Sequence, residues 1–185
     1  MEENLYAPPT AVVADYAPVR DEDVRFFAVS PFKLVVLSTC TLGLYQIYWF
    51  YRHWVLIKER SEPLIIPWAR AFFGFFWCYS CFEFIRKEEK RLDVEPTLSA
   101  GPMAIGWIAI SLTSRLPVPY LLIMFLAPLL LARVQRHVNH INELVAPGHD
   151  RNTRFSAWNW LAVVVGGIFI GLIILGLAVP ARTHA

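Results

Sequence analysis

Long runs of uncharged residues alternate with short charged segments along most of this chain. The longest run covers residues 155–180, and shorter runs cover residues 34–51, 96–114 and 116–131. A helix needs about 20 mostly apolar residues to cross the hydrocarbon of a bilayer. The pattern therefore predicts four membrane-spanning helices, of which the two middle ones form a hairpin around Arg115.

A fifth apolar segment, residues 63–85, is harder to interpret because Arg70 and Glu83 interrupt it. Only residues 71–82 between them are free of charge, which is short for a full crossing. Two interpretations stay open. The segment is either a tilted span whose charged ends reach the headgroups, or a re-entrant or interfacial helix.

These segments together predict an all-α fold, a polytopic transmembrane bundle of about five hydrophobic helices. Beyond the fourth span, Val134, Val138 and Ile141 recur at helical spacing, which indicates an amphipathic helix at the membrane surface. Residues 1–25 contain six acidic residues and no periodicity, so we expect a disordered tail. The expected boundaries are 1–25 for the tail and 26–181 for the transmembrane domain, with hydrophobic segments at about 32–53, 63–86, 98–114, 116–132 and 157–180 and the amphipathic helix at 133–146.

Composition and charge support a membrane protein. Apolar residues make up 56% of the chain and charged residues 17%, against about 25% charged residues in soluble domains. The net charge of +2 is too small to attract a nucleic acid, and the basic residues lie beside apolar runs, as topology determinants do. Five spans with a cytoplasmic N-terminus place 11 of the 17 basic residues inside, and a re-entrant second segment places 12 there. The polar N-terminus, which lacks a signal-peptide pattern, favours the five-span arrangement.

The segment at residues 41–54, TLGLYQIYWFYRHW, carries a Thr-Leu-Gly-Leu-Tyr motif followed by Tyr48 and Trp49. It resembles small bacterial multipass membrane proteins of a domain-of-unknown-function family with a Thr-Leu-Gly-Ile/Leu-Tyr and Tyr-Trp signature. The N-terminal Asn-Leu-Tyr-Ala-Pro-Pro and the later Val-Gln-Arg-His-Val-Asn-His-Ile-Asn are similar to segments of uncharacterised inner-membrane proteins. The resemblance implies the bacterial cytoplasmic (inner) membrane and implies no activity.

Cys78 and Cys81 form a Cys-Tyr-Ser-Cys motif, a spacing that suits a redox pair or a shared metal. An aromatic-rich helix also accommodates a thiol as a small apolar group, which is the interpretation we favour. His137 and His140, with Glu143, have the spacing of metal ligands, but no further ligand is apparent. We therefore expect no metal and no cofactor.

Four charged residues lie near or within the predicted spans, namely Lys33, Arg70, Glu83 and Arg115. A charge buried in lipid costs at least about 2.5 kcal/mol, so such residues either reach the headgroups or serve a function. Lys33 and Arg115 lie at span ends, where snorkelling accounts for them. Gln46 is polar within the first span. Convergence of Gln46, Arg70 and Glu83 on one cavity would indicate a small transporter or channel.

Gly167 and Gly171 form a GxxxG pair in the last apolar run. Such pairs let two helices approach closely. We therefore expect the last span to pack against a membrane-protein partner or a second copy of the chain.

Familiar catalytic motifs, namely the phosphate-binding P-loop, HExxH and GxSxG, are missing from the sequence, so an enzyme is unsupported. The recognisable features are anchors and packing motifs. The leading hypothesis is a non-enzymatic scaffold or accessory subunit of the bacterial inner membrane, in contact with the lipid bilayer and without a nucleic-acid partner. The transporter and the thiol redox protein are the alternatives.

Overall fold

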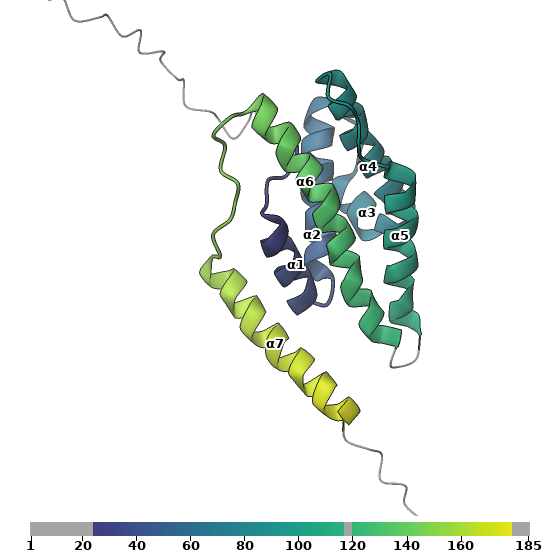
Figure 1. Cartoon of the computed structure of the whole chain (residues 1–185), viewed down its shortest axis with the longest axis vertical. Helices are drawn as coiled ribbons and strands as arrows, with labels where there is room; N and C mark the ends of the chain where they lie inside the picture. The colour runs from purple at the N-terminus through teal and green to yellow at the C-terminus, as the bar shows by residue number, and fades with distance from the viewer. Residues whose placement is uncertain (1–23, 117–119, 179–185) are drawn as a thin grey trace, which may run out of the picture.

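The computed structural model describes residues 24–116 and 120–178, and the regular structure in these ranges is entirely helical, as expected (Figure 1). Most of the predicted tail, residues 1–25, lies outside the described residues. The elements are α1 (Pro31–Cys40), α2 (Leu44–Arg60), α3 (Pro67–Phe72), α4 (Gly74–Arg91), α5 (Ala100–Leu112), η2 (Thr113–Arg115), η3 (Tyr120–Leu126), α6 (Ala127–Val145) and α7 (Ala157–Ala178).

The prediction of about five membrane-spanning helices is wrong. Within the described residues one helix, α7, is long and apolar enough to cross a membrane. The other apolar helices are too short, since α1 has 10 residues and α5 has 13, which is about 20 Å of helix. The multipass bundle is therefore replaced by a helical bundle with a single candidate span, which nearly coincides with the predicted segment 157–180.

The first predicted span, residues 32–53, is split into α1 and α2 by a turn at residues 41–43. Gly43 has a φ of 95°, which favours glycine, and its N–H donates to the Ser38 carbonyl at 2.8 Å. The Thr41 hydroxyl donates to the Leu37 carbonyl and accepts from the Tyr45 N–H at 2.9 Å. The Thr-Leu-Gly-Leu-Tyr motif thus ends one helix and starts the next.

The structure also divides the other predicted segments. Residues 63–86 break at Phe73, and α4 then continues to Arg91 with a charged second half. The segment 116–132 contributes η3 and the start of α6. Because α6 also contains the predicted amphipathic helix, one 19-residue helix runs from an apolar beginning to a more polar second half.

The core forms around α2, which packs on α3 and α4, and α6, which packs on α1, α4 and α5. The segment at residues 24–29 lies in this core and buries Phe26, Phe27 and Val29. Its placement beside α6 connects the beginning of the described chain to a helix more than 100 residues away. The largest fully buried apolar side chains are Trp49, Phe50, Trp54, Phe82, Leu34, Leu37, Ile85, Leu131 and Ile141.

Helix α7 lies beside α1 and extends away from the rest of the bundle (Figure 1). The two helices meet at Gly166, where an added Cβ would lie 1.8 Å from the carbonyl oxygen of Cys40. By contrast, Gly167 and Gly171 of the predicted GxxxG pair face open space. Within the chain, the close approach is therefore made by Gly166.

Replacing Gly166 with alanine should separate α7 from α1, because the new methyl group meets backbone and has no flexible side chain to displace. We expect Gly166→Ala to lower the thermal unfolding midpoint in detergent and to accelerate alkylation of Cys40, which lies under the contact. Both are measured on the full chain, by circular dichroism and by mass spectrometry.

The neighbouring variant Gly167→Ala is the matched control. Its methyl group enters open space, so the higher helix propensity of alanine should leave stability unchanged or raise it by up to about 1 kcal/mol. Equal behaviour of the two variants would contradict the close contact.

Candidate functional site

One end of the bundle exposes large apolar side chains. We define this apolar end as residues 42–47 at the start of α2, α3 with the following Phe73, the first half of α4, and η3. Trp68 and Phe72 on α3 are each 66% exposed, and Phe76 on α4 is 80% exposed. Soluble monomers rarely expose contiguous apolar patches above a few hundred Å². Other exposed members are Leu42, Leu44, Ile47, Phe73, Phe75, Trp77, Tyr79, Tyr120, Leu122, Ile123 and Leu126.

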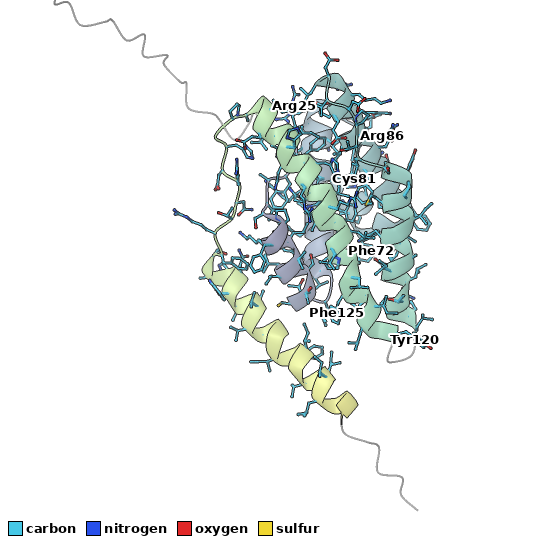
Figure 2. The ribbon with its side chains drawn as sticks, viewed as in Figure 1. Arg25, Phe72, Cys81, Arg86, Tyr120 and Phe125 are labelled. Carbon is cyan, nitrogen blue, oxygen red and sulfur yellow. The ribbon has the colours of Figure 1, made fainter. Side chains whose placement is uncertain are left out.

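The charged residues gather at the opposite end, which we define as the second halves of α2, α4 and α6. Figure 2 shows Arg25 and Arg86 toward this end, and Tyr120 and Phe125 at the other. Arg86 makes two hydrogen bonds to Glu83, at 2.6 and 2.8 Å. The charged end also contains a cavity of about 310 Å³ lined by Arg25, Arg60, Lys87, Arg91, Glu62 and Glu88 among others.

Helix α7 begins between these two ends. Along the apolar stretch Ala157–Gly176, Gly166 is buried against α1 and every other residue is half-buried or exposed. Trp158 and Trp160 in its first turn are exposed, and Arg154 precedes it. Aromatic and basic residues at the end of an apolar helix are typical of the membrane interface.

A buried polar side chain, Gln135 of α6, connects three parts of the core. Its carbonyl oxygen accepts from the Trp49 indole N–H at 2.5 Å, and its amide nitrogen donates to the Phe27 carbonyl at 3.1 Å and to Asn139 at 2.7 Å. About two turns further along α6, Asn142 bonds both the N–H and the carbonyl of Phe26. These side-chain amides therefore make the hydrogen bonds to the backbone of residues 24–29 that a neighbouring β-strand would otherwise make.

His53 is fully buried beside this network. Its ring lies 4.0 Å from that of Trp49, and neither ring nitrogen makes a hydrogen bond of ordinary geometry. Burial lowers the pKa of His53 to about 3, the nearby Gln135 amide partly offsets this, and Arg52 lowers the pKa further. The imidazole is thus a neutral core group at physiological pH.

Glu89 and His137 form a buried pair between α4 and α6. The Glu89 side chain is 2% exposed, and its Oε1 lies 2.7 Å from His137 Nδ1. His140 is exposed and Glu143 pairs with Arg151, so neither joins His137 at the contact with Glu89. The described residues contain no group of three metal-binding side chains.

Gln46 is buried at the apolar end and accepts a hydrogen bond from the Trp107 indole N–H at 2.8 Å. It lines a cavity of about 220 Å³ with Phe50, Trp107, Ser111 and other residues. The bond links α2 to α5 and explains why an amide is tolerated there.

The other members of the predicted polar stripe lie elsewhere. The guanidinium of Arg70 stacks between the rings of Trp54 and Trp77, at 4.6 and 4.3 Å from their centroids, where aromatic faces stabilise a cation. Glu83 pairs with Arg86. Neither lines the cavity next to Gln46, so the structure brings no two of these three residues together. Arg115 is exposed at the end of η2.

Cys78 and Cys81 lie on α4 and are buried as free thiols. Burial raises the pKa of Cys78 to about 11 and raises that of Cys81 further. A thiolate is the nucleophile in thiol exchange, so both cysteines behave as packing residues in this conformation.

Lys33 is one of the residues whose environment the sequence did not indicate. It was expected to reach the headgroups from a span end, yet it is only 4% exposed. Its ammonium group bonds residues of the loop before α7, more than 115 positions away. The contact depends on the tertiary fold, so no local pattern reveals it.

Searches of protein-family models, curated proteins and solved structures found no match to this chain. The resemblance of residues 41–54 to a family of bacterial membrane proteins therefore stays a prediction.

The buried His53 should make the protein less stable in acid. The unfolded chain binds a proton at this imidazole near pH 6.5, whereas the folded protein does so only near pH 3. Stability contributed by the neutral ring is therefore complete above about pH 6.5 and is lost toward pH 3, by at most about 1.4 kcal/mol per pH unit. His53→Phe should flatten this part of the pH profile of thermal unfolding, and His140→Phe, at an exposed position, should not. An unchanged profile in His53→Phe would contradict the assignment.

The cysteines should differ in their reactivity toward alkylating reagents. Cys40 is partly exposed and should react in the native protein, whereas Cys78 and Cys81 should react only after denaturation. Mass spectrometry of each tryptic peptide measures the rates. Equal rates at the three positions, or a native mass two hydrogens lower that reduction restores, would support the thiol redox alternative instead.

Proposed function

We propose that this chain is a membrane protein anchored by α7, whose bundle inserts its apolar end into the same membrane and keeps its charged end in water. In this position it serves as a non-enzymatic scaffold or accessory subunit. Only α7 crosses the membrane in this arrangement, and the bundle enters the bilayer from one side without crossing it.

The separation of apolar and charged side chains is the observation that carries this proposal. Burying apolar surface gains roughly 25 cal/mol per Å², so the exposed rings of Trp68, Phe72 and Phe76 favour lipid. A charged side chain deep in the bilayer costs about 2.5 kcal/mol or more. The only charge of α3 is Arg70, which two indole rings already stack against.

A groove between α2 and α3 supports contact with acyl chains. It has a volume of about 410 Å³ and is lined by Leu44, Ile47, Tyr48, Tyr51, Trp68, Ala71 and Phe72. Ionisable groups other than the two tyrosines are absent from this lining, so a hydrocarbon chain meets apolar walls along it.

The distribution of basic residues favours one orientation. Lys and Arg residues gather at the charged end and before α7, and such residues are enriched on the cytoplasmic side of membrane proteins. We therefore orient the charged end toward the cytoplasm. The membrane is the bacterial inner membrane if the resemblance at residues 41–54 holds.

The scaffold assignment rests on how the polar side chains are used. His53, Gln135 and Asn142 serve the core, Gln46 links α2 to α5, and Cys78 is buried. Their contacts are those of structural residues. The cavity of the charged end, with four basic and two acidic residues, offers a surface for a partner that carries acidic groups.

Fluorescent labels at the two ends test the embedded position. Full-length Phe76→Cys and Arg91→Cys, each labelled with an environment-sensitive NBD dye, are reconstituted into phosphatidylcholine vesicles. We expect blue-shifted emission and quenching by brominated lipid at position 76, and red-shifted emission quenched by aqueous iodide at position 91.

Both labelled variants also carry Cys40→Ser, which removes the partly exposed native thiol, and retain the buried Cys78 and Cys81, so Cys40→Ser protein treated with the dye supplies the background. An aqueous signal at position 76, with the protein still bound to the vesicles, would refute insertion of the apolar end and leave α7 as a lone anchor. Protein that stays in the supernatant would refute the membrane assignment altogether.

A further inference from the structure

The ammonium group of Lys33 is buried at the junction of α1, the core and the loop before α7. It donates to Asn152 Oδ1 at 2.8 Å and to the Arg154 carbonyl oxygen at 2.6 Å. With the Asn159 amide oxygen turned toward it, a third acceptor lies at 3.1 Å. The three protons of the ammonium group are therefore satisfied, and every acceptor is electrically neutral.

The charge of Lys33 is not compensated in the same way. Among the described residues Lys33 makes no ion pair within 4 Å. Asp150 acts on it from a greater distance, raising the pKa of Lys33, but burial lowers that pKa by more. Buried charges in proteins are normally paired. A counter-charge is thus expected beside Lys33.

A cavity of about 290 Å³ adjoins the ammonium group. Its lining is polar and carries a second cation, Arg154, but no carboxylate. An anion that enters it would therefore meet two positive charges and no repulsion from the lining itself. The lining residues are Phe27, Lys33, Tyr45, Tyr48, Asn152, Arg154, Ser156 and Asn159.

The donors around this cavity suit phosphate oxygens. The guanidinium of Arg154 offers a planar fork of N–H donors, and the hydroxyl groups of Tyr45 and Tyr48 offer two more. Ser156 and Asn159 belong to the N-terminal turn of α7, where the helix dipole adds positive potential. Lys33 would attract the phosphate through its positive charge, and the exposed Arg154 would donate directed hydrogen bonds to the phosphate oxygens.

The position of the cavity relative to the proposed membrane indicates which molecule would supply a phosphate group. It lies where α7 begins, next to the exposed Trp158 and Trp160, and this is the level of the headgroups in the proposed orientation. We propose that the Lys33 cavity binds a phosphate group, supplied by an anionic phospholipid such as phosphatidylglycerol. This inference rests on the proposed function for the source of the phosphate, but not for the chemistry of its recognition.

Thermal unfolding of the full-length protein in dodecyl maltoside tests the proposal. Phosphatidylglycerol, phosphatidylcholine or inorganic phosphate is added at matched ionic strength, and the midpoint is followed by circular dichroism. A ligand of the folded state raises the midpoint with its concentration. We expect phosphatidylglycerol to raise it by several degrees, and phosphatidylcholine, whose choline group brings a positive charge to the site, to raise it less.

Two variants and a matched control locate the effect. Lys33→Met removes the buried charge at similar length, and Arg154→Gln removes an exposed guanidinium that is not needed for the core. Each should weaken the apparent affinity for phosphatidylglycerol by about tenfold or more. Arg151→Gln, three residues away and outside the cavity lining, should respond like the wild type.

An unchanged phosphatidylglycerol effect in both Lys33→Met and Arg154→Gln would overturn the proposal, as would no effect on the wild type. Stabilisation by inorganic phosphate that equals that of the lipid and depends on the same two residues would keep the phosphate site and refute its lipid source. Failure of the phosphate site and failure of the proposed function give different results. A lipid-shielded label at position 76 without any phosphate effect refutes this inference alone, and an aqueous label at position 76 refutes the embedded bundle.

Discussion

The need of every ionised side chain for water or for a stabilising partner determines how this chain is arranged. Most charged residues of the bundle gather where the second halves of α2, α4 and α6 meet, and Arg115 is exposed elsewhere, at the end of η2. Arg70 lies on the apolar side and is accommodated between two indole rings. Lys33 lies in the interior and is accommodated by three neutral oxygens.

The same requirement applies to polar groups that carry no charge. Residues 24–29 enter the core without a β-sheet or a helix to satisfy their backbone, so Gln135, Asn139 and Asn142 on one face of α6 bond to it. A buried polar group left without a partner costs about 1–3 kcal/mol. The amides of α6 are therefore the condition for burying Phe26, Phe27 and Val29 against α2.

The sequence indicated the helical class, the long apolar helix near 157–180 and the amphipathic part of α6, because each depends on periodicity or on a long run of one residue type. It did not indicate the division of residues 32–53. An uncharged run of sufficient length looks like a span, and only the positive φ of Gly43 and the capping by Thr41 reveal a turn inside it. The roles of Lys33, His53 and Gln135 were missed for a different reason. Their partners are 86 or more positions away along the chain, or consist of buried surroundings that no local pattern describes.

Helix α7 is joined to the bundle through α1. At one end of this junction, Gly166 lets α7 approach the last carbonyl groups of α1, and at the other end Lys33 bonds the loop from which α7 starts. These two contacts fix the angle at which α7 leaves the bundle. Because Lys33 makes no ion pair within 4 Å among the described residues, an anion in the adjoining cavity would strengthen one of the two contacts. If α7 is the anchor and the cavity binds a lipid phosphate, as proposed, the tilt of α7 and the composition of the surrounding lipid are coupled through the buried Lys33.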